Sequence, residues 1–281
     1  MTRLLLCATV LISALRASDL QRAMDRAMTG LAGTAVALDV DSGRVLARYH
    51  PQVAARRLAR PGSTVKPFTM LALLASSASP RTLICARRLL IGARHMDCTH
   101  PPTADPLDAV AALAYSCNYY FASLAAGFRN SDLVETFTRA GLISRTGLDP
   151  DEAVGRIVPP ATLEQRQLLA LGEGNILVTP LGLVSAYRKL ALQRNRTIAE
   201  GLEAATEYGT ARLSRPAGMK VYGKTGTASD PMTGQVHAWF AGYAPAESPR
   251  IVLIVFLEQG VGGRDAAPIA RELFQAALPA P

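Results

Sequence analysis

A serine and a lysine three residues apart are the first residues of this sequence whose types and spacing could carry chemistry. They stand in Ser63-Thr-Val-Lys66, directly after Pro61-Gly62. A turn at Pro61-Gly62 would deliver the serine to the start of a helix, where residues i and i+3 share one face. A hydroxyl needs an adjacent base to become a good nucleophile, and a lysine desolvated in a cleft can supply one. We therefore predict Ser63 as the nucleophile and Lys66 as its base, against the alternative of a capped helix with a solvated lysine.

A second polar group, Ser116-Cys-Asn118, interrupts the apolar segment from Leu113 to Phe121. Buried polar side chains need hydrogen-bond partners, so this triplet is expected to face either a site or the backbone. In a site, Ser116 would relay a proton between Lys66 and a leaving amine, and the Asn118 amide would hold a substrate amide group. In the alternative, the triplet breaks a helix and Asn118 satisfies only backbone groups. Cys117, with its apolar neighbours, is expected to be a packing residue.

A third group, Lys224-Thr-Gly-Thr227, lies on a predicted strand. Gly226 has no side chain and would leave the strand edge open to the backbone of an extended substrate. Lys224 and Thr225 would offer a positive charge and a hydroxyl to a substrate carboxylate. The backbone N–H groups of Thr227 and Ser63 would together form an oxyanion hole.

The same lysine and threonine also complete a phosphate-loop pattern, Gly218-Met-Lys-Val-Tyr-Gly-Lys-Thr225. A phosphate loop follows a strand and opens a helix, whereas here Gly226, Pro231 and Gly234 follow. Too little of the chain remains after Thr225 for the parallel sheet of a nucleotide hydrolase. The pattern therefore does not predict nucleotide binding.

The order of hydrophobic patterns predicts an α+β fold. Residues 19–28 have helical periodicity, and two β-prone runs within 34–49 flank a turn at Asp41-Ser42-Gly43. A mostly helical region follows, and then strands are expected around 223–228, 237–243 and 251–257, with a closing helix over 266–278. Because the terminal segments must share one sheet, we expect an antiparallel β-sheet flanked by helices, with a large, mostly α-helical lobe inserted between the N-terminal hairpin and the C-terminal strands.

The length of 281 residues and the hydrophobic fraction of 49% suit a single folded domain. We expect a signal peptide over residues 1–17 and one domain over 18–281, in which 18–66 and 206–281 form an α/β lobe and 67–205 form an α-rich lobe. The signal peptide is predicted from Arg3, the apolar run from Leu4 to Leu15 and the small residues near its end. It implies export to the periplasm or another extracytoplasmic space, with an uncleaved anchor as the alternative.

Three cysteines, Cys85, Cys98 and Cys117, remain after such a leader. In an oxidising compartment a disulfide between Cys85 and Cys98 is favoured. The alternatives are unlinked thiols or a zinc site formed by Cys85, His95, Cys98 and His100, whose spacing matches no common zinc signature. The sequence therefore predicts no metal and no cofactor.

The net charge is +8 and the isoelectric point is about 9.6. Lys and Arg are scattered through the sequence without interleaved aromatic residues, so no nucleic-acid partner is predicted. A basic exported protein could associate peripherally with anionic wall polymers or lipid head groups through long-range attraction. The alternative is a solvated surface with no specific partner.

Taken together and in this order, the three motifs resemble those of penicillin-binding proteins and serine β-lactamases. The likeness to penicillin-binding transpeptidase domains continues through Pro61–Pro67, Gly172–Leu181 and His237–Pro245. It implies acylation of Ser63 by a D-Ala-D-Ala peptidoglycan stem peptide and transfer to an amine or to water, hence a D,D-transpeptidase or D,D-carboxypeptidase. It also implies that β-lactams trap the acyl-enzyme as covalent inhibitors. The short stretch before the first strand suggests a transpeptidase domain without an N-terminal pedestal, and Glu173 stands where the family usually has Gln.

Two other outcomes share these motifs. Class A β-lactamases place a glutamate four residues before an asparagine, whereas Glu152 and Glu164 are followed at that interval by Arg156 and Leu168. Class D enzymes usually have an aliphatic residue at the position of Asn118. A class D-like β-lactamase and a non-catalytic penicillin-binding sensor or scaffold therefore remain as alternatives to the transpeptidase.

Overall fold

The computed structural model describes residues 18–76, 80–103, 105–230 and 232–278. The predicted signal peptide, residues 1–17, lies outside the described residues. Residues 18–28 are helical, and the elements after them follow in chain order: β1 (Gly33–Asp39), β2 (Val45–Tyr49), α2 (Pro51–Arg56), η1 (Gly62–Val65), α3 (Lys66–Ala75), β3 (Leu90–Ile91), β4 (Arg94–His95), α4 (Ala109–Ala114), α5 (Asn118–Ala125), α6 (Asp132–Ala140), β5 (Arg156–Ile157), α7 (Leu163–Leu171), β6 (Ile176–Leu177), α8 (Pro180–Gln193), α9 (Arg196–Glu207), η2 (Arg212–Ser214), β7 (Tyr222–Ser229), β8 (Val236–Ala244), β9 (Ile251–Leu257), η3 (Gly262–Ala266) and α10 (Ala267–Ala277).

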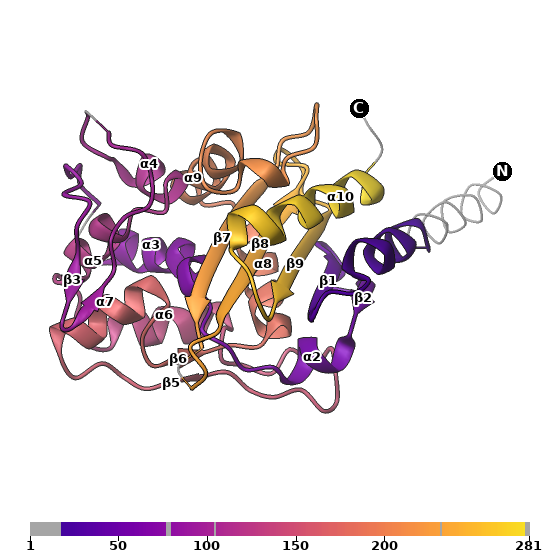
Figure 1. Cartoon of the computed structure of the whole chain (residues 1–281), viewed down its shortest axis with the longest axis horizontal. Coiled ribbons are helices and arrows are strands. Elements are labelled where there is room, and N and C mark those ends of the chain that lie inside the picture. The colour runs from indigo at the N-terminus through magenta and orange to yellow at the C-terminus, as the bar shows by residue number, and fades with distance from the viewer. Residues whose placement is uncertain (1–17, 77–79, 104, 231, 279–281) are drawn as a thin grey trace.

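Within the described ranges, five strands form one antiparallel sheet in the order β2-β1-β9-β8-β7. The predicted N-terminal hairpin supplies β2 and β1, and the C-terminal strands extend the sheet from β1 outward, so the two ends of the chain share one sheet (Figure 1). Most helices between β2 and β7 gather on the side of the molecule that β7 borders. The predicted α+β fold, an antiparallel sheet with a helical insertion, is confirmed.

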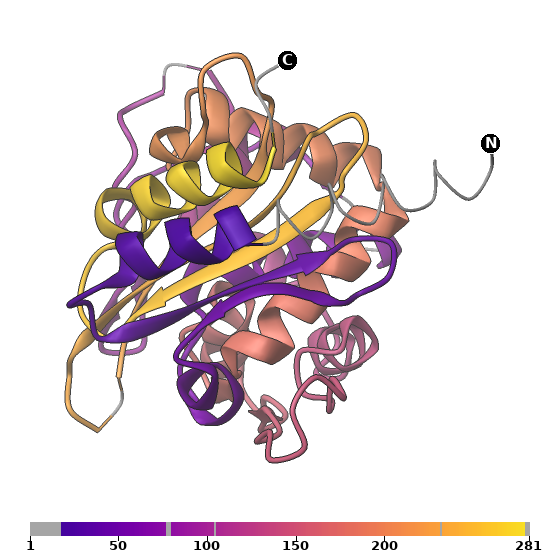
Figure 2. The same ribbon diagram turned by 90° about the vertical axis from the view of Figure 1, so that its right-hand side faces the viewer.

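Strand β9 is buried along its whole length, as its continuous apolar sequence predicts. Its side chains alternate between two cores. Val252, Ile254 and Phe256 pack in one core, and Leu253 and Val255 pack in the other. The side chains enter two cores because helices cover both faces of the sheet: helix 18–28 and α10 cover one face, and α8 lies against the other (Figure 2). The sheet is therefore a rigid middle layer, and β7 forms one of its edges.

Local sequence signals account for several helix ends. Helix α8 begins after Thr179, whose hydroxyl accepts a hydrogen bond from the Gly182 N–H at 3.0 Å, with Pro180 in the first turn. Helix α6 ends at Gly141, which adopts a left-handed φ of 89°. None of the described helices is long and apolar enough to cross a membrane.

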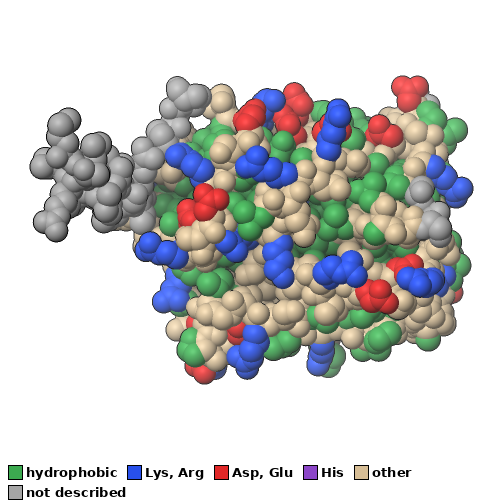
Figure 3. Space-filling view, turned by 180° about the vertical axis from the view of Figure 1, so that it is seen from behind, with side chains coloured by type: hydrophobic (Ala, Val, Ile, Leu, Met, Phe, Trp, Pro, Cys, Tyr) green, Lys and Arg blue, Asp and Glu red, His purple; other side chains and the backbone are tan. Residues whose placement is uncertain are grey.

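The molecular surface mixes charges of both signs. On the rear face, Lys and Arg side chains lie between Asp and Glu side chains and hydrophobic groups and do not gather in one patch (Figure 3). Part of this mixture consists of short-range pairs on helices, such as Arg196 with Glu200. On that face the Lys and Arg side chains are therefore spread out and form no basic patch.

Candidate active site

Ser63 lies in the short 3-10 helix η1, which continues directly into α3 at Lys66. The preceding turn is held closely: Gly62 has a φ of 51°, and its N–H donates to the Gly172 carbonyl at 3.1 Å. A β-carbon on Gly172 would lie 2.1 Å from the Gly62 carbonyl oxygen, so only glycine fits there. The backbone that carries Ser63 is thus fixed against the segment after α7, and the Ser63 side chain is half-buried.

Lys66 is completely buried, and its amine points at the second motif. Its Nζ lies 2.7 Å from the Ser116 carbonyl oxygen, 3.2 Å from Ser116 Oγ and 2.6 Å from Asn118 Oδ1. Burial disfavours the charged ammonium and lowers the pKa of Lys66 to about 8. A substantial fraction of Lys66 is therefore neutral, and able to accept a proton, slightly above neutral pH.

Ser116 occupies the turn between α4 and α5 in a left-handed conformation, with a φ of 55°. A non-glycine residue in this region costs about 1–2 kcal/mol. The conformation directs both the carbonyl and the hydroxyl of Ser116 toward Lys66. Asn118 opens α5, and its Nδ2 donates to the Met96 carbonyl at 3.0 Å. The triplet is thus a helix break, as one alternative expected, and at the same time its polar side chains face the site.

Lys224 reaches Ser116 from β7. Its Nζ lies 2.8 Å from Ser116 Oγ and 3.1 Å from the Thr225 carbonyl oxygen, and the side chain is completely buried. Desolvation, followed by the positive charge of Lys66, lowers the pKa of Lys224 well below its ordinary value. A single hydroxyl therefore connects two buried amines that come from α3 and β7, two elements far apart in the sequence.

The outer edge of β7 borders the serine. A β-carbon on Gly62 would lie 2.8 Å from the Thr227 carbonyl oxygen. At the hairpin end the Asp230 N–H donates to the Gln235 carbonyl at 2.8 Å, and bonded and non-bonded pairs alternate along antiparallel strands. By this alternation Thr227 directs its N–H and carbonyl away from β8, toward the edge beside Ser63. Thr227 is exposed, so the edge is accessible.

Gly226 is required by close packing between β7 and η1. A β-carbon there would lie 2.6 Å from the Pro61 carbonyl oxygen and 2.9 Å from Thr64 Cγ2. Thr225 beside it donates to Thr210 Oγ1 at 3.0 Å, a partner in the segment after α9 that sequence reasoning did not find. The glycine thus permits contact between the strand and the serine turn, in addition to leaving the strand edge open.

A Gly226→Ala protein is expected to lose about 1–3 kcal/mol of unfolding free energy, because the added methyl group overlaps a backbone oxygen that cannot rotate away. Urea denaturation measures the change. Ser229→Ala at the end of the same strand is the matched control and is expected to stay within about 0.5 kcal/mol of the parent. Equal stability of the Gly226→Ala and parent proteins would contradict the close packing.

The cysteines differ from the sequence-based expectation. Cys85, Cys98 and Cys117 are free in this structure, and the Cys85 and Cys98 sulfurs are 3.6 Å apart, far beyond the ~2.05 Å of a disulfide bond. Cys117 is fully buried, as expected of a packing residue, but its sulfur lies against the other two. His95, part of the alternative zinc set, is exposed on β4 and does not join the cluster, whereas His100 does.

Glu173, the departure from the usual glutamine, is buried and forms an ion pair with the partly exposed Arg94. Arg94 on β4 donates to Glu173 Oε2 at 2.9 Å and to the Glu173 carbonyl at 2.8 Å. Burial raises the pKa of the Glu173 carboxyl, and the Arg94 charge opposes that shift. The pair ties the β3–β4 hairpin to the segment that holds the serine turn.

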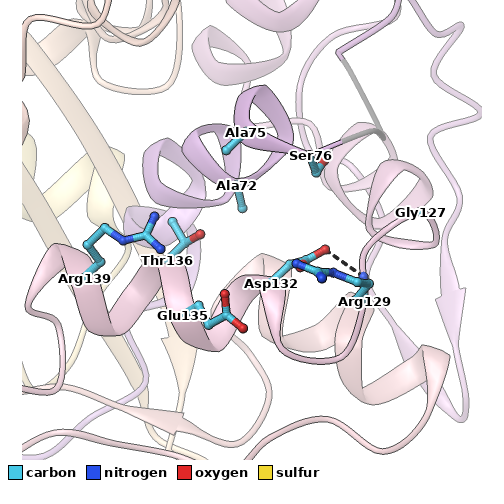
Figure 4. Close-up of a pocket in the computed structure, with 9 residues that line it drawn as sticks. All are labelled: Ala72, Ala75, Ser76, Gly127, Arg129, Asp132, Glu135, Thr136 and Arg139. Carbon is cyan, nitrogen blue, oxygen red and sulfur yellow. Dashed lines mark hydrogen bonds and ion pairs between the residues drawn. The ribbon is translucent and has the colours of Figure 1, made fainter.

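A pocket of about 460 Å³ lies elsewhere, between α3 and α6. Figure 4 shows its lining, with Arg129 paired to Asp132 at one end and Arg139 and Thr136 at the other. None of the three motifs contributes to this pocket. This pocket is therefore separate from the edge of β7 where the two buried amines meet.

The three motifs converge beside β7, at one edge of the sheet. A family model described as the penicillin binding protein transpeptidase domain matches residues 33–275, and the chain belongs to this family. Curated relatives include peptidoglycan D,D-transpeptidase PbpA of Mycolicibacterium smegmatis, 28% identical over 274 residues, and PbpA of Mycobacterium tuberculosis, 27% identical over 276 residues. Each match covers 78% of this chain and 55% of the relative, so the chain spans about half the length of these relatives.

Solved structures agree with the family in fold. Pseudomonas aeruginosa PBP2, in complex with WCK 5153, superposes with a TM-score of 0.82 at 23% identity, covering 93% of this chain and 74% of that one. Penicillin-binding protein A of M. tuberculosis, solved as a ceftriaxone acyl-enzyme complex, superposes with a TM-score of 0.80 at 21% identity, covering 92% and 78%. At these identities the likeness establishes the fold, and it is the fold predicted from the sequence.

Proposed function

We propose that this chain is a serine D,D-transpeptidase or D,D-carboxypeptidase that acts on D-Ala-D-Ala peptidoglycan stem peptides through an acyl-enzyme at Ser63. The observation that carries the proposal is the meeting of two buried amines, Lys66 and Lys224, at the single hydroxyl of Ser116. Burying two amines costs stability, so their presence indicates a functional role, and perturbed lysines beside a serine suit acyl transfer. Curated relatives named D,D-transpeptidase support the same reaction.

Acylation begins with proton transfer from the Ser63 hydroxyl to neutral Lys66. Ser63 Oγ attacks the carbonyl carbon of the penultimate D-Ala, and the resulting oxyanion is held by the backbone N–H groups of Ser63 and Thr227. Collapse of this intermediate breaks the peptide bond. The proton passes from Lys66 through Ser116 to the departing D-Ala amine, which leaves Lys66 neutral again. An incoming amine gives transpeptidation, and water gives carboxypeptidase activity.

Substrate binding uses the open edge of β7. An extended stem peptide adds beside the strand at Gly226 and Thr227, as a backbone pairs with any free sheet edge. Lys224 and Thr225 bind the terminal carboxylate, and Asn118 holds a substrate amide. A β-lactam presents a similar carboxylate and a strained amide, so it acylates the same serine.

The proposed substrate also implies a compartment. Stem peptides lie outside the cytoplasm, and we assign the chain to the periplasm or another extracytoplasmic space, where its positive charge favours association with anionic wall polymers.

We also propose a division of the domain into two lobes. Residues 18–66 and 206–281 form the α/β lobe, and residues 67–205 form the α-rich lobe. The reactive groups lie where these lobes meet: Ser63 and Lys224 come from the first, and Ser116 and Asn118 from the second.

The acylation rate is expected to depend on pH through Lys66. Its pKa is lowered to about 8, and only the neutral amine accepts the serine proton. The second-order rate of penicillin acylation should therefore rise about tenfold per pH unit below pH 8 and level off above it. Stopped-flow acylation from pH 5.5 to 9.5 measures the profile. A rate that is flat across this range would exclude Lys66 as the titrating base.

Release of D-Ala from a stem-peptide mimic is the test of the proposed reaction. We expect D-Ala release. With an added amino acceptor, a transpeptidase should also give a cross-linked product, whereas a carboxypeptidase should give only the hydrolysed peptide. Penicillin should inhibit this release by forming a long-lived adduct. An adduct that disappears within seconds would identify a β-lactamase, and a stable adduct without D-Ala release would identify a sensor or scaffold.

A further inference from the structure

Three cysteine sulfurs form a compact triangle behind the active site. The Sγ–Sγ distances are 3.6 Å for Cys85–Cys98, 3.7 Å for Cys98–Cys117 and 3.4 Å for Cys117–Cys85. Cys98 and Cys117 are buried, and Cys85 is partly buried. Two of these residues come from the segment between α3 and α4, and the third lies in the Ser116–Asn118 triplet.

His100 completes the group with a buried nitrogen. Its Nδ1 lies 2.7 Å from the Pro101 carbonyl oxygen, which can only accept, so Nδ1 carries the hydrogen and Nε2 has a free lone pair. The residue is 4% exposed, and within the described part of the chain Nε2 has no hydrogen-bond partner. Leaving a buried acceptor unpaired is costly, so this nitrogen requires a ligand. Four ligand atoms lie within 4.8 Å of one another, one each from Cys85, Cys98, His100 and Cys117.

We propose that Cys85, Cys98, Cys117 and His100 bind one zinc ion in a closed, structural tetrahedral site. At a Zn–S distance of about 2.3 Å, the sulfurs of a tetrahedral site lie about 3.8 Å apart, close to the triangle seen here. Three thiolates and an imidazole form a donor set that binds zinc more strongly than it binds hard cations. Binding releases three thiol protons and involves no redox step.

The surrounding backbone supports thiolate ligands. The N–H of Arg87 donates to Cys85 Sγ at 3.3 Å, that of Tyr119 to Cys98 Sγ at 3.3 Å, and that of Tyr120 to Cys117 Sγ at 3.4 Å. The carbonyl that accepts from His100 Nδ1 fixes the ring in the orientation that metal-bound histidines have. A disulfide between any two of the cysteines would leave the third thiol unlinked and His100 Nε2 without a partner, so the zinc site accounts for more of the structure.

The position of Cys117 gives the site a role in the fold. It stands between Ser116 and Asn118, and Asn118 also donates to the Met96 carbonyl in the cysteine-bearing segment. Zinc would therefore bind the segment between α3 and α4 to the turn in which Ser116 has its left-handed conformation. The site is a structural support for the motif, with all four ligand positions filled by protein.

Metal analysis of the full chain, purified under reducing conditions from zinc-supplemented medium, tests the proposal independently of any reaction at Ser63. We expect about one zinc per chain by mass spectrometry. Because loss of an outer-shell partner alone costs about 10–100-fold in affinity, His100→Ala and Cys85→Ser should weaken zinc binding by more than about 100-fold. His95→Ala, which removes the exposed neighbouring histidine, is the matched control and should retain the zinc.

A second measurement keeps the test decisive if a ligand variant fails to fold. Parent protein stripped of zinc and loaded with cobalt(II) should show strong thiolate charge-transfer absorption, which zinc should abolish. Parent protein that binds neither zinc nor cobalt under reducing conditions would overturn the proposal. So would loss of zinc in His95→Ala with retention in His100→Ala.

Discussion

A Lys66→Met protein is expected to be acylated by penicillin about 10²–10⁴-fold more slowly than the parent, the range lost when a positioned general base is removed. Methionine keeps most of the length and fills the same buried space, so the substitution removes the amine while leaving the packing of α3 largely intact. The expected loss lies in the rate of bond formation, because Lys66 takes the serine proton but does not touch the carboxylate end of the ligand. Stopped-flow acylation separates the rate of bond formation from binding.

The control for Lys66→Met is Lys189→Met on α8, which removes an exposed lysine. Its acylation rate should match that of the parent. The Lys66→Met substitution leaves two acceptors, Asn118 Oδ1 and the Ser116 carbonyl oxygen, without their hydrogen bonds from Lys66. Thermal unfolding of both variants shows whether this loss destabilises the fold. A folded Lys66→Met protein that reacts at the parental rate would remove Lys66 from the mechanism.

The second large effect is expected at Ser116, whose hydroxyl connects the two buried amines. Ser116→Ala should slow D-Ala release and acylation by about 100-fold or more, because the path from Lys66 to the leaving amine is broken. The backbone offers a way to separate chemistry from strain. Alanine in the left-handed conformation pays a penalty similar to that of serine, whereas glycine pays none.

Ser116→Gly is therefore the informative companion. It should be at least as stable as Ser116→Ala in this turn yet equally slow, because both lack the hydroxyl. Thermal unfolding and acylation rates measured on both proteins make the comparison. Recovery of the rate in Ser116→Gly alone would mean that the backbone conformation, and not the hydroxyl, is what the reaction requires.

Much of the fold was predictable because its signals are local. The apolar run of β9 and the hairpin turn after β1 each depend on neighbouring residues, and the structure has them at or within a few residues of the expected positions. The motif residues were also found from spacing, because Ser63 and Lys66 lie within one turn. Their approach to Ser116 and Lys224 was a hypothesis from the residue types, supported by the resemblance, since no local pattern brings β7 beside η1.

What the sequence could not reveal depends on contacts between distant segments. Cys117 was expected to pack against apolar neighbours, but the turn after α4 brings its sulfur to Cys85, 32 positions earlier in the chain. His95 and His100 were indistinguishable as ligands until their exposure was known. The requirement for glycine at Gly172 likewise arises from the approach of the Gly62 carbonyl, and the Arg94–Glu173 pair arises from a hairpin that no periodicity predicts.

Peptide mapping of the penicillin-treated parent protein determines whether Ser63 is the acylated nucleophile. Intact mass should increase by one penicillin per chain, and fragmentation should locate the added mass on Ser63, with no adduct in a folded Ser63→Ala protein. A parent protein without adduct, or an adduct that persists unchanged in Ser63→Ala, would show that Ser63 is not the nucleophile.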